Sequence, residues 1–545
     1  MREEVTVTSE TRKRGALLSS ASLLWCAIAV MATIALYART LHNSLDGDFG
    51  SSASASCLLM ARSFTQMGPI YTHFVPIQNN LPIGSNPDVY LHWPPLYPLA
   101  LEGFFHTFGD TPIAGRLLGL LIVLAGAAIV ALIARTLYST RVALLSGFFY
   151  LTCRATFHGA RPLVQQPLAI LFGSAAVLFF LLAIKGAPQD AANSKQGTSG
   201  NLHKLYGLAG IVCISLAILS AWDPIFIPFG LLAGAIYGHN RFGIKLGIVY
   251  VATAILTFAV VQADYILSYP QLFKNQLSTI AFRMGLVRFD QSSSLSIHSI
   301  IYHSDYSGQL SVFDSLNSVS GFIYDFIGPF ALLSVCILTL IWFRKAGLRE
   351  RNPDSSFGFL LFSLGLPWIA WYLIMRNFVS IHSFALVLAV PFAAIASARV
   401  LDEIWVFLNE DTEHAPILWI MSTVFPFLIF FPLLTEVRFA HVPPEPVLFS
   451  DLSPLVEQET PQNSVILSPS NSLVPSYYSH RHFVRGIRSD AWLKQAVALA
   501  HADFSGSPVF LAVQDADRKD FTELLSNLKV YARKGDSELY EIDSK

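Results

Sequence analysis

The sequence predicts an all-α polytopic membrane domain of about 11 transmembrane helices, followed by a small C-terminal α/β domain. Three observations support this prediction. Of the 545 residues, 53% are hydrophobic and only 13% are charged, and the mean hydropathy is +0.50. Soluble globular domains carry about 25% charged residues. Long apolar runs recur between residues 16 and 435, and the composition then changes to alternating short apolar and amphipathic stretches.

The first apolar run, residues 16–41, follows a polar segment, residues 1–15, that ends in a basic cluster. This run is too long for the apolar core of a signal peptide, which has about 7–15 residues, so we expect an uncleaved first span. The membrane domain is expected to cover residues 16–440. The other expected spans are residues 111–134, 142–157, 163–184, 205–221, 224–238, 243–263, 321–343, 357–374, 381–399 and 415–435.

Lysine and arginine residues set the expected orientation in the membrane. They cluster in alternate links, at residues 135–141, 241–245 and 344–351. Short loops rich in Lys and Arg remain in the cytoplasm. We therefore expect a multi-pass protein of the cell membrane with a cytoplasmic N-terminus. The long loops 42–110 and 264–320 and the C-terminal domain are then extracytoplasmic.

The C-terminal part has its own secondary-structure pattern. Residues 441–462 are rich in Pro and Glu and are expected to form a linker. In residues 463–545, NSVILSP, SPVFLAVQ and SELYEI predict short strands, whereas AWLKQAVALAHAD and DRKDFTELLSNLK predict amphipathic helices. Asp517 is the candidate N-cap of the second helix.

Composition also limits the kinds of binding partner and metal site that we expect. The net charge of −1 provides no basic field, so nucleic acid is not an expected partner. The five cysteines include no CxxC pair, and most lie in apolar runs, which argues against a disulfide framework and a cysteine zinc site.

Two stretches of the loop 42–110 carry the residue types that catalysis needs. Asp46 and Asp48 form an Asp-Gly-Asp triplet just after the first span, where they could act as a general base, hold a metal ion or form a solvated turn. In the second stretch, Pro94 and Pro95 prevent a continuous helix and present His92 and Trp93 in an extended geometry. Alternatively, this second stretch only breaks the chain before the amphipathic segment 96–108 and has no role in a site.

The order of these motifs resembles the polyprenyl-phosphate-sugar-dependent glycosyltransferases of the type C fold, which include protein O-mannosyltransferases and lipid A aminoarabinose transferases. The matching residues are Asp46/Asp48, Ala61-Arg62, His92 to Pro98, Gly109 and Ala114 to Leu117, and His382 with Pro391 later in the chain. Two departures stand out. The spacing before Ala61 is longer, and the stretch Arg161 to Pro167 lacks the acid that often opens the fourth span of the family.

The resemblance implies an inverting transfer of a hexosyl or pentosyl group from a polyprenyl-phosphate carrier to a lipid, glycan or protein acceptor at the outer face. Asp48 is the first choice for the general base and Asp46 the second. The expected donor- and substrate-binding residues are Arg62, His92, Trp93, Tyr97, Arg116, Arg283, Arg376 and His382. The sequence assigns no cofactor. Binding of a divalent cation by Asp46 and Asp48 stays an alternative.

Several of these residues have an alternative role that the sequence does not exclude. Arg62 and Arg116 could contact phosphate or pair with a loop acid, and His382 could contact the donor or begin a helix. Lys274 and Arg288 are expected to anchor the second long loop at lipid headgroups.

The alternative functions are a transporter or lipid flippase and a non-catalytic assembly subunit. Transport requires charges inside the bundle, whereas the centres of the expected spans hold almost none. An assembly subunit would leave the Asp and His-Trp-Pro-Pro residues without a role.

Overall fold

The computed structural model describes most of the chain. The described residues are 9–41, 45, 51–81, 88–160, 163–187, 199–270, 276–277, 280–281, 283–284, 286, 317–321, 323–347, 355–410, 449, 451–470, 472–487, 489–521 and 525–542. The expected span 415–435 and the residues Asp46, Asp48, Lys274 and Arg288 lie outside these ranges.

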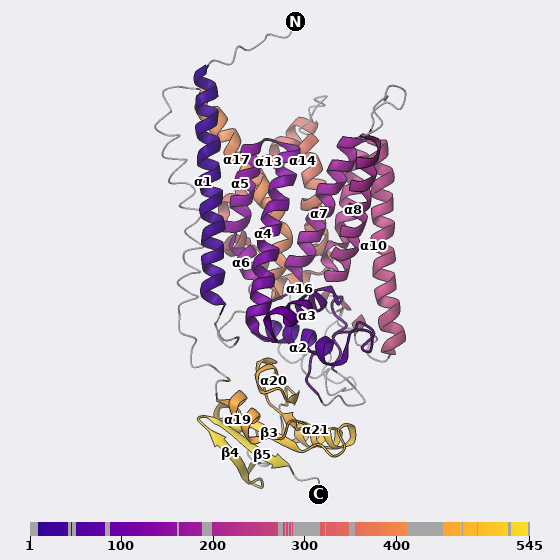
Figure 1. The fold of residues 1–545 in the computed structure, drawn as a ribbon, viewed down its shortest axis with the longest axis vertical. Helices are drawn as coiled ribbons and strands as arrows, with labels where there is room; N and C mark the ends of the chain where they lie inside the picture. Colours follow the sequence, from indigo (N-terminus) through magenta and orange to yellow (C-terminus); the bar gives the residue numbers. More distant parts are fainter. Residues whose placement is uncertain are drawn as a thin grey trace.

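The membrane domain is a bundle of long apolar helices (Figure 1). Its main helices are α1 (Ser9–Thr40), α4 (Pro112–Leu137), α5 (Thr140–Thr152), α7 (Gln166–Gly186), α8 (Ser199–Ser220), α9 (Phe226–Tyr237), α10 (Arg241–Ser268), α13 (Pro329–Gly347), the continuous run α14–η3–α15 (Ser355–Leu360, Leu361–Gly365, Leu366–Ile374) and α17 (Val390–Glu410). Each of these helices overlaps one of the expected spans other than 415–435. Two bounds differ: α5 ends at Thr152, before the expected end at residue 157, and α17 begins at Val390, after the expected start at residue 381. Within the described ranges, seven helical stretches are long and apolar enough to cross a membrane, and α9 and α13 are apolar but shorter. The chain is a multi-pass membrane protein.

Small residues let the helices approach closely. A Cβ atom on Gly230 of α9 would lie 2.1 Å from the backbone oxygen of Phe362 in η3, and one on Gly210 of α8 would lie 1.6 Å from the Tyr250 hydroxyl of α10. Only glycine allows either contact. Close approach of this kind is typical of membrane bundles, where packing rather than hydrophobic burial drives association.

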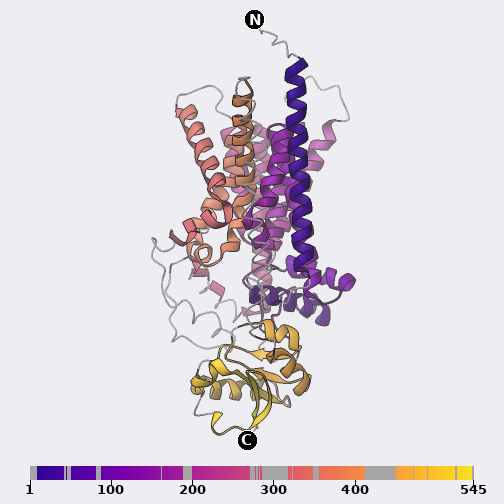
Figure 2. The same cartoon turned by 90° about the vertical axis from the view of Figure 1, so that its left-hand side faces the viewer.

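Short elements cover one end of the bundle, which we call the domain-side end because the C-terminal domain lies there (Figures 1 and 2). They are α2 (Ser51–Met67), α3 (Leu96–Phe108), α6 (Arg154–Ala160), η1 (Asp223–Ile225), η2 (Ile323–Ile327), α16 (Arg376–Ile381) and η4 (Ser383–Ala389). One buried cluster joins α2, α3 and the start of α4 to Leu473, Val474 and Tyr477 of the C-terminal domain. The loop 42–110 and this domain therefore share an apolar core.

The C-terminal domain is a five-stranded sheet with helices on both faces. The strands β1 (Val465–Leu467), β2 (His482–Val484), β3 (Val509–Gln514), β4 (Val530–Lys534) and β5 (Ser537–Ile542) lie in the order β2-β1-β3-β5-β4. β1 pairs in parallel with β2 and β3, and the remaining pairs are antiparallel. Successive residues of β1 point to opposite faces, so Val465 packs with α21 (Asp490–Asp503) and Ile466 with α19 (Leu452–Glu459).

The three strands and the first helix predicted for this domain are confirmed, and two other details differ. Residues 452–459, within the expected linker, form α19 and cover the sheet. Asp517 is not the N-cap predicted for the second helix, because Asp515–Asp520 form the short 3-10 helix η6 and Gln514 is its N-cap. Residues 522–524 of that predicted helix lie outside the described residues. Asp517 therefore lies inside η6 and not at its cap.

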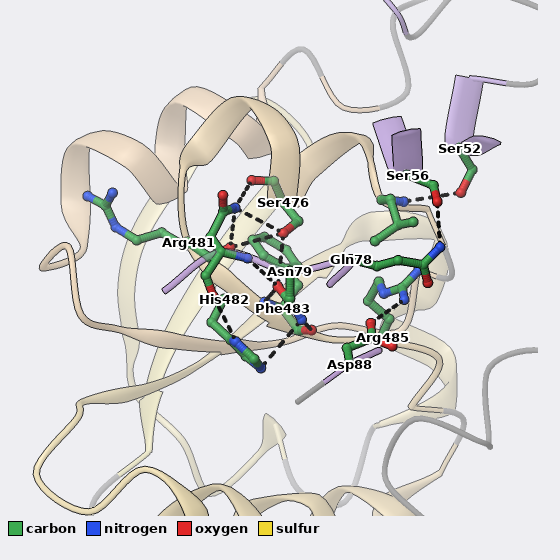
Figure 3. Close-up of polar contacts among 12 residues, drawn as sticks. Ser52, Ser56, Gln78, Asn79, Asp88, Ser476, Arg481, His482, Phe483 and Arg485 are labelled. Carbon is green, nitrogen blue, oxygen red and sulfur yellow. Dashed lines mark hydrogen bonds and ion pairs between the residues drawn. The ribbon is translucent and has the colours of Figure 1, made fainter. Parts of the chain in front are cut away.

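A buried polar network joins the loop to the C-terminal domain (Figure 3). The side chain of Asn79 donates to the Phe483 carbonyl at 2.9 Å and accepts from the Phe483 N–H at 3.1 Å, as a neighbouring strand would. Asn80 donates to the carbonyl of Arg481 at 3.0 Å. Arg485 and Asp88, both almost fully buried, form an ion pair at 3.0 Å. These bonds satisfy polar groups that burial would otherwise penalise, so they fix how the two parts fit.

Candidate active site

The C-terminal domain contacts the chain on both sides of the two predicted acids. Asp46 and Asp48 themselves are not among the described residues, but Leu45 and Ser52 are. The N–H of Leu45, a fully buried residue, donates to the Tyr478 hydroxyl at 2.9 Å. The N–H of Leu473 donates to the Ser52 hydroxyl at 3.3 Å. Both contacts come from α20 (Val474–Ser479) or the residue before it.

Arg283 is the centre of a second group of predicted residues, at the same end of the bundle. The carbon of its guanidinium group lies 5.2 Å from the ring centre of Phe378 and 5.7 Å from that of Trp93. The rings of Phe378 and His382 are 4.8 Å apart. A cation over aromatic faces is attracted by their negative electrostatic potential. Trp93, Arg283 and His382, which come from three distant segments, are thereby brought together.

The backbone around His92 is fixed by donors from other segments. Gln276 donates to the Leu91 carbonyl at 2.6 Å, Trp222 to the His92 carbonyl at 2.9 Å and Tyr265 to the Trp93 carbonyl at 3.0 Å. Pro94 and Pro95 follow, and neither has an N–H group with which to form a helical turn, so α3 begins only at Leu96. Three consecutive carbonyls with distant partners make this turn a rigid part of the site.

Asp223 is the charged residue of this site that the sequence prediction did not include. It opens η1 in the turn between α8 and α9 and is 2% exposed. Burial raises the pKa of its carboxyl to about 8, although the positive charge of Arg283 acts in the opposite direction. Burial lowers the pKa of His382 to about 3, and Arg283 adds to this shift. At neutral pH, His382 is therefore a neutral imidazole and Arg283 is the cation of the pair.

Arg62 lies away from this group. Its guanidinium forms an ion pair with Asp110 and donates to Asn80 Oδ1 and to the Tyr477 carbonyl, both at 2.9 Å. It also lies over the Tyr477 ring, 4.4 Å from the ring centre. The structure thus gives Arg62 the ion pair with a loop acid, one of the two roles that the sequence left open.

Three other predicted residues also have contacts outside the Arg283 group. Arg116, in α4, donates to the Leu41 carbonyl at 2.9 Å and so holds the end of α1. Tyr97, in α3, is 1% exposed and packs in the apolar core shared by the loop and the C-terminal domain. Arg376 begins α16, close enough to Tyr372 to act on its hydroxyl electrostatically. Arg116 and Tyr97 therefore have clear structural contacts, whatever else they bind.

Sequence reasoning missed Asp223 and Phe378 as members of the site. The sequence left Trp222 and Asp223 open between a cap of the turn and a ligand of the site, and the cap was favoured. Nothing local to Phe378 indicates that it meets Arg283. In the described part of the chain, no group of three His, Cys, Asp or Glu residues is placed to hold a metal ion.

Comparisons with known proteins identify the fold. No protein-family model matches this sequence, and no curated protein matches it. Among solved structures, it is similar to ArnT from Cupriavidus metallidurans bound to undecaprenyl phosphate, with a TM-score of 0.59 and 13% identity over 96% of this chain and 98% of that one.

The chain is also similar to the apo oligosaccharyltransferase of Archaeoglobus fulgidus, with a TM-score of 0.55 and 11% identity over 90% of this chain and 69% of that one. The oligosaccharyltransferase AglB from the same organism, in complex with an inhibitory peptide and a dolichol-phosphate, has a TM-score of 0.52 and 11% identity over 90% of this chain and 69% of that one. At these identities the likeness shows the fold, which is that of the type C membrane glycosyltransferases. The predicted fold class and the resemblance seen in the motifs are confirmed at this level.

Proposed function

We propose that this multi-pass membrane protein, which has the type C glycosyltransferase fold, transfers a sugar from a polyprenyl-phosphate carrier to an acceptor. The observation that carries the proposal is the group around Arg283, in which a guanidinium, a neutral imidazole and two aromatic rings meet at one end of the bundle. Two of the similar structures hold a polyprenyl phosphate, undecaprenyl phosphate in one and dolichol-phosphate in the other.

Arg283 suits the phosphate of such a donor for electrostatic reasons. Guanidinium groups donate two parallel hydrogen bonds to phosphate oxygens and keep their charge when partly desolvated. The aromatic faces of Trp93 and Phe378 hold the guanidinium without neutralising it. As the bond from sugar to phosphate breaks, negative charge grows on the departing phosphate, and a fixed cation there lowers the barrier.

The acceptor hydroxyl attacks the anomeric carbon from the face opposite the phosphate, so the configuration inverts. The new bond forms between the hydroxyl oxygen and the anomeric carbon, and the bond from that carbon to the phosphate oxygen breaks with both electrons leaving on the lipid phosphate. The hydroxyl proton passes to the carboxylate of Asp48, with Asp46 as the second candidate. An aspartate of ordinary pKa, about 3.9, is a weak base, so the proton moves late, when the sugar has become cationic.

The orientation proposed from the basic links places this chemistry at the outer face. Phe378, which lies under the Arg283 guanidinium, belongs to α16, and both α16 and the C-terminal domain lie at the domain-side end of the bundle (Figure 1). The basic residues Arg241 and Lys245 begin α10 at the opposite end. A lipid-linked donor is suited to the outer face, where nucleotide sugars are absent.

The test is donor binding and sugar transfer by the purified chain with Arg283→Ala. Loss of a hydrogen-bonding group that stabilises the negative charge developing on the phosphate lowers turnover by about 10²–10³-fold. Arg283→Lys should recover part of that loss, because the charge returns without the two-pronged geometry. Arg241→Ala, at the opposite end of the bundle, is the matched control. Normal transfer by Arg283→Ala would contradict the assignment of the phosphate site.

A further inference from the structure

A small recess near Arg283 is lined by buried polar groups that have no side-chain hydrogen-bond partner among the described residues. Neither carboxyl oxygen of Asp223 accepts or donates a hydrogen bond with another side chain in the described structure, although Asp223 is 2% exposed. The buried indole N–H of Trp368, from α15, also has no acceptor among the described residues. Both residues line the same recess.

The rest of the recess is apolar. Ile170 of α7, Ile227 of α9, Leu364 of η3 and Leu388 of η4 contribute its walls, so four elements of the bundle meet there. The space is large enough for about one water-sized group. An entire sugar ring does not fit, whereas one substituent of a ring does.

A third group without a partner lies on the same helix face. Gln166 is fully buried, and its amide oxygen and nitrogen have no hydrogen-bond partner within the described ranges. It precedes Ile170 by four residues on α7, so the two side chains share a face, with Gln166 nearer the domain-side end. Unpaired polar atoms thus continue from the recess toward the end of the bundle.

Leaving these groups unpaired is costly. A buried polar atom without a hydrogen-bond partner destabilises the fold, so a bound group that supplies the missing partner is favoured there. A hydroxyl group matches the recess, because its oxygen accepts from the indole N–H of Trp368 while it exchanges a hydrogen bond with Asp223. A second positive charge does not match, since Arg283 already acts electrostatically on Asp223.

We propose that this recess binds one neutral hydroxyl of the donor sugar, with Asp223 and Trp368 as residues that determine donor specificity. The inference rests on the proposed function, because it needs the lipid phosphate at Arg283. It adds that the enzyme recognises a neutral sugar next to that phosphate and not an amino sugar. Sites that hydrogen-bond a substrate hydroxyl discriminate strongly against groups that cannot make the bond, because their own polar atoms are then left unpaired.

The experiment compares two classes of lipid on the full-length purified protein. Binding of undecaprenyl phosphate alone is measured beside undecaprenyl-phosphate-linked glucose, mannose, arabinose and aminoarabinose. The variants are Asp223→Asn, Asp223→Leu and Trp368→Phe. Asp536→Asn, an exposed position in the C-terminal domain, is the matched control.

The expected result is that the native chain binds at least one neutral-sugar lipid about 10-fold or more tightly than bare undecaprenyl phosphate. Asp223→Leu and Trp368→Phe should lose that preference while binding the bare lipid phosphate normally, which also shows that they are folded. Asp223→Asn should lose less, because its amide still forms hydrogen bonds.

Three results would overturn the inference. A preference that survives in both Asp223→Leu and Trp368→Phe would mean that the recess holds only water. A native preference for the aminoarabinose lipid, lost in Asp223→Leu, would replace the neutral hydroxyl by an amine. Equal binding of sugar-linked and bare lipid by the native chain would exclude sugar recognition, whereas failure to bind any lipid phosphate would refute the proposed function itself.

Discussion

Replacing Arg62 with alanine should weaken the attachment of the C-terminal domain and leave lipid-phosphate binding intact. The Arg62 side chain is 4% exposed, and the side chain of its partner Asp110 is 30% exposed. The substitution removes this ion pair, two hydrogen bonds and the contact with the Tyr477 ring. Breaking a fully buried pair costs about 3–5 kcal/mol, and exposure of one partner reduces this to about 2–3 kcal/mol.

The assay is thermal unfolding of the detergent-solubilised chain, with undecaprenyl phosphate binding measured in parallel. Arg62→Ala should lower the melting temperature by several degrees. Asp110→Asn should cost less, because the amide oxygen still accepts from the guanidinium. In the double variant the losses should not add, since both substitutions remove the same pair. Glu403→Gln, in the exposed pair with Arg399, is the control and should change stability by less than about 1 kcal/mol.

The opposite pattern would refute this reasoning. If Arg62→Ala melted like the native chain but lost its affinity for undecaprenyl phosphate, Arg62 would be a donor contact and the ion pair with Asp110 would be incidental. Limited proteolysis gives a second readout, because a weakened interface should expose the junction between the loop and the C-terminal domain to cleavage.

Three further predictions concern pH, folding and topology. Because burial raises the pKa of Asp223 to about 8, the folded chain keeps a proton that the unfolded chain loses above about pH 4, and stability should fall as pH rises toward 8. Asp223→Asn should remove that part of the slope, and equal slopes in melting scans from pH 5 to 8 would contradict the buried carboxyl. A fragment of residues 449–545 should be soluble and protease-resistant, whereas one of residues 463–545 lacks α19 and should be degraded, because α19 covers one face of the sheet. A reporter fused after residue 545 should be extracytoplasmic and one in residues 185–204 cytoplasmic, and the reverse labelling would move the proposed site to the cytoplasmic face.

The spans could be predicted because a bilayer requires about 20 consecutive apolar residues, and such runs are local in sequence. The same argument fails for the surface elements. α2 is a buried helix at the domain-side end, but its sequence, rich in Ser and Ala, resembles an irregular insertion. β4 carries mostly exposed side chains and therefore shows no alternating apolar pattern.

The site was predictable only in part, for a related reason. The Pro-Pro pair makes the turn at His92 and Trp93 visible locally, and the charge of Arg283 stands out in an apolar chain. The partners that give these residues their geometry are far away in sequence. Asn79 meets Phe483, 404 residues later, and Asp223 faces Arg283 only because α8 and α9 place it there. No local pattern encodes such contacts.

The central claim is transfer from a lipid phosphate with an aspartate from the loop as base, and the most direct measurement is sugar transfer by Asp48→Asn and Asp46→Asn. Labelled sugar is supplied on polyprenyl phosphate, and donor binding is measured on the same preparations. Asp48→Asn should bind the donor normally and lose about 10²-fold or more in turnover, because the amide keeps the shape but cannot take the proton. Asp46→Asn should lose less. Normal turnover in both variants would contradict this account, and a loss confined to Asp46→Asn would transfer the role of base to Asp46.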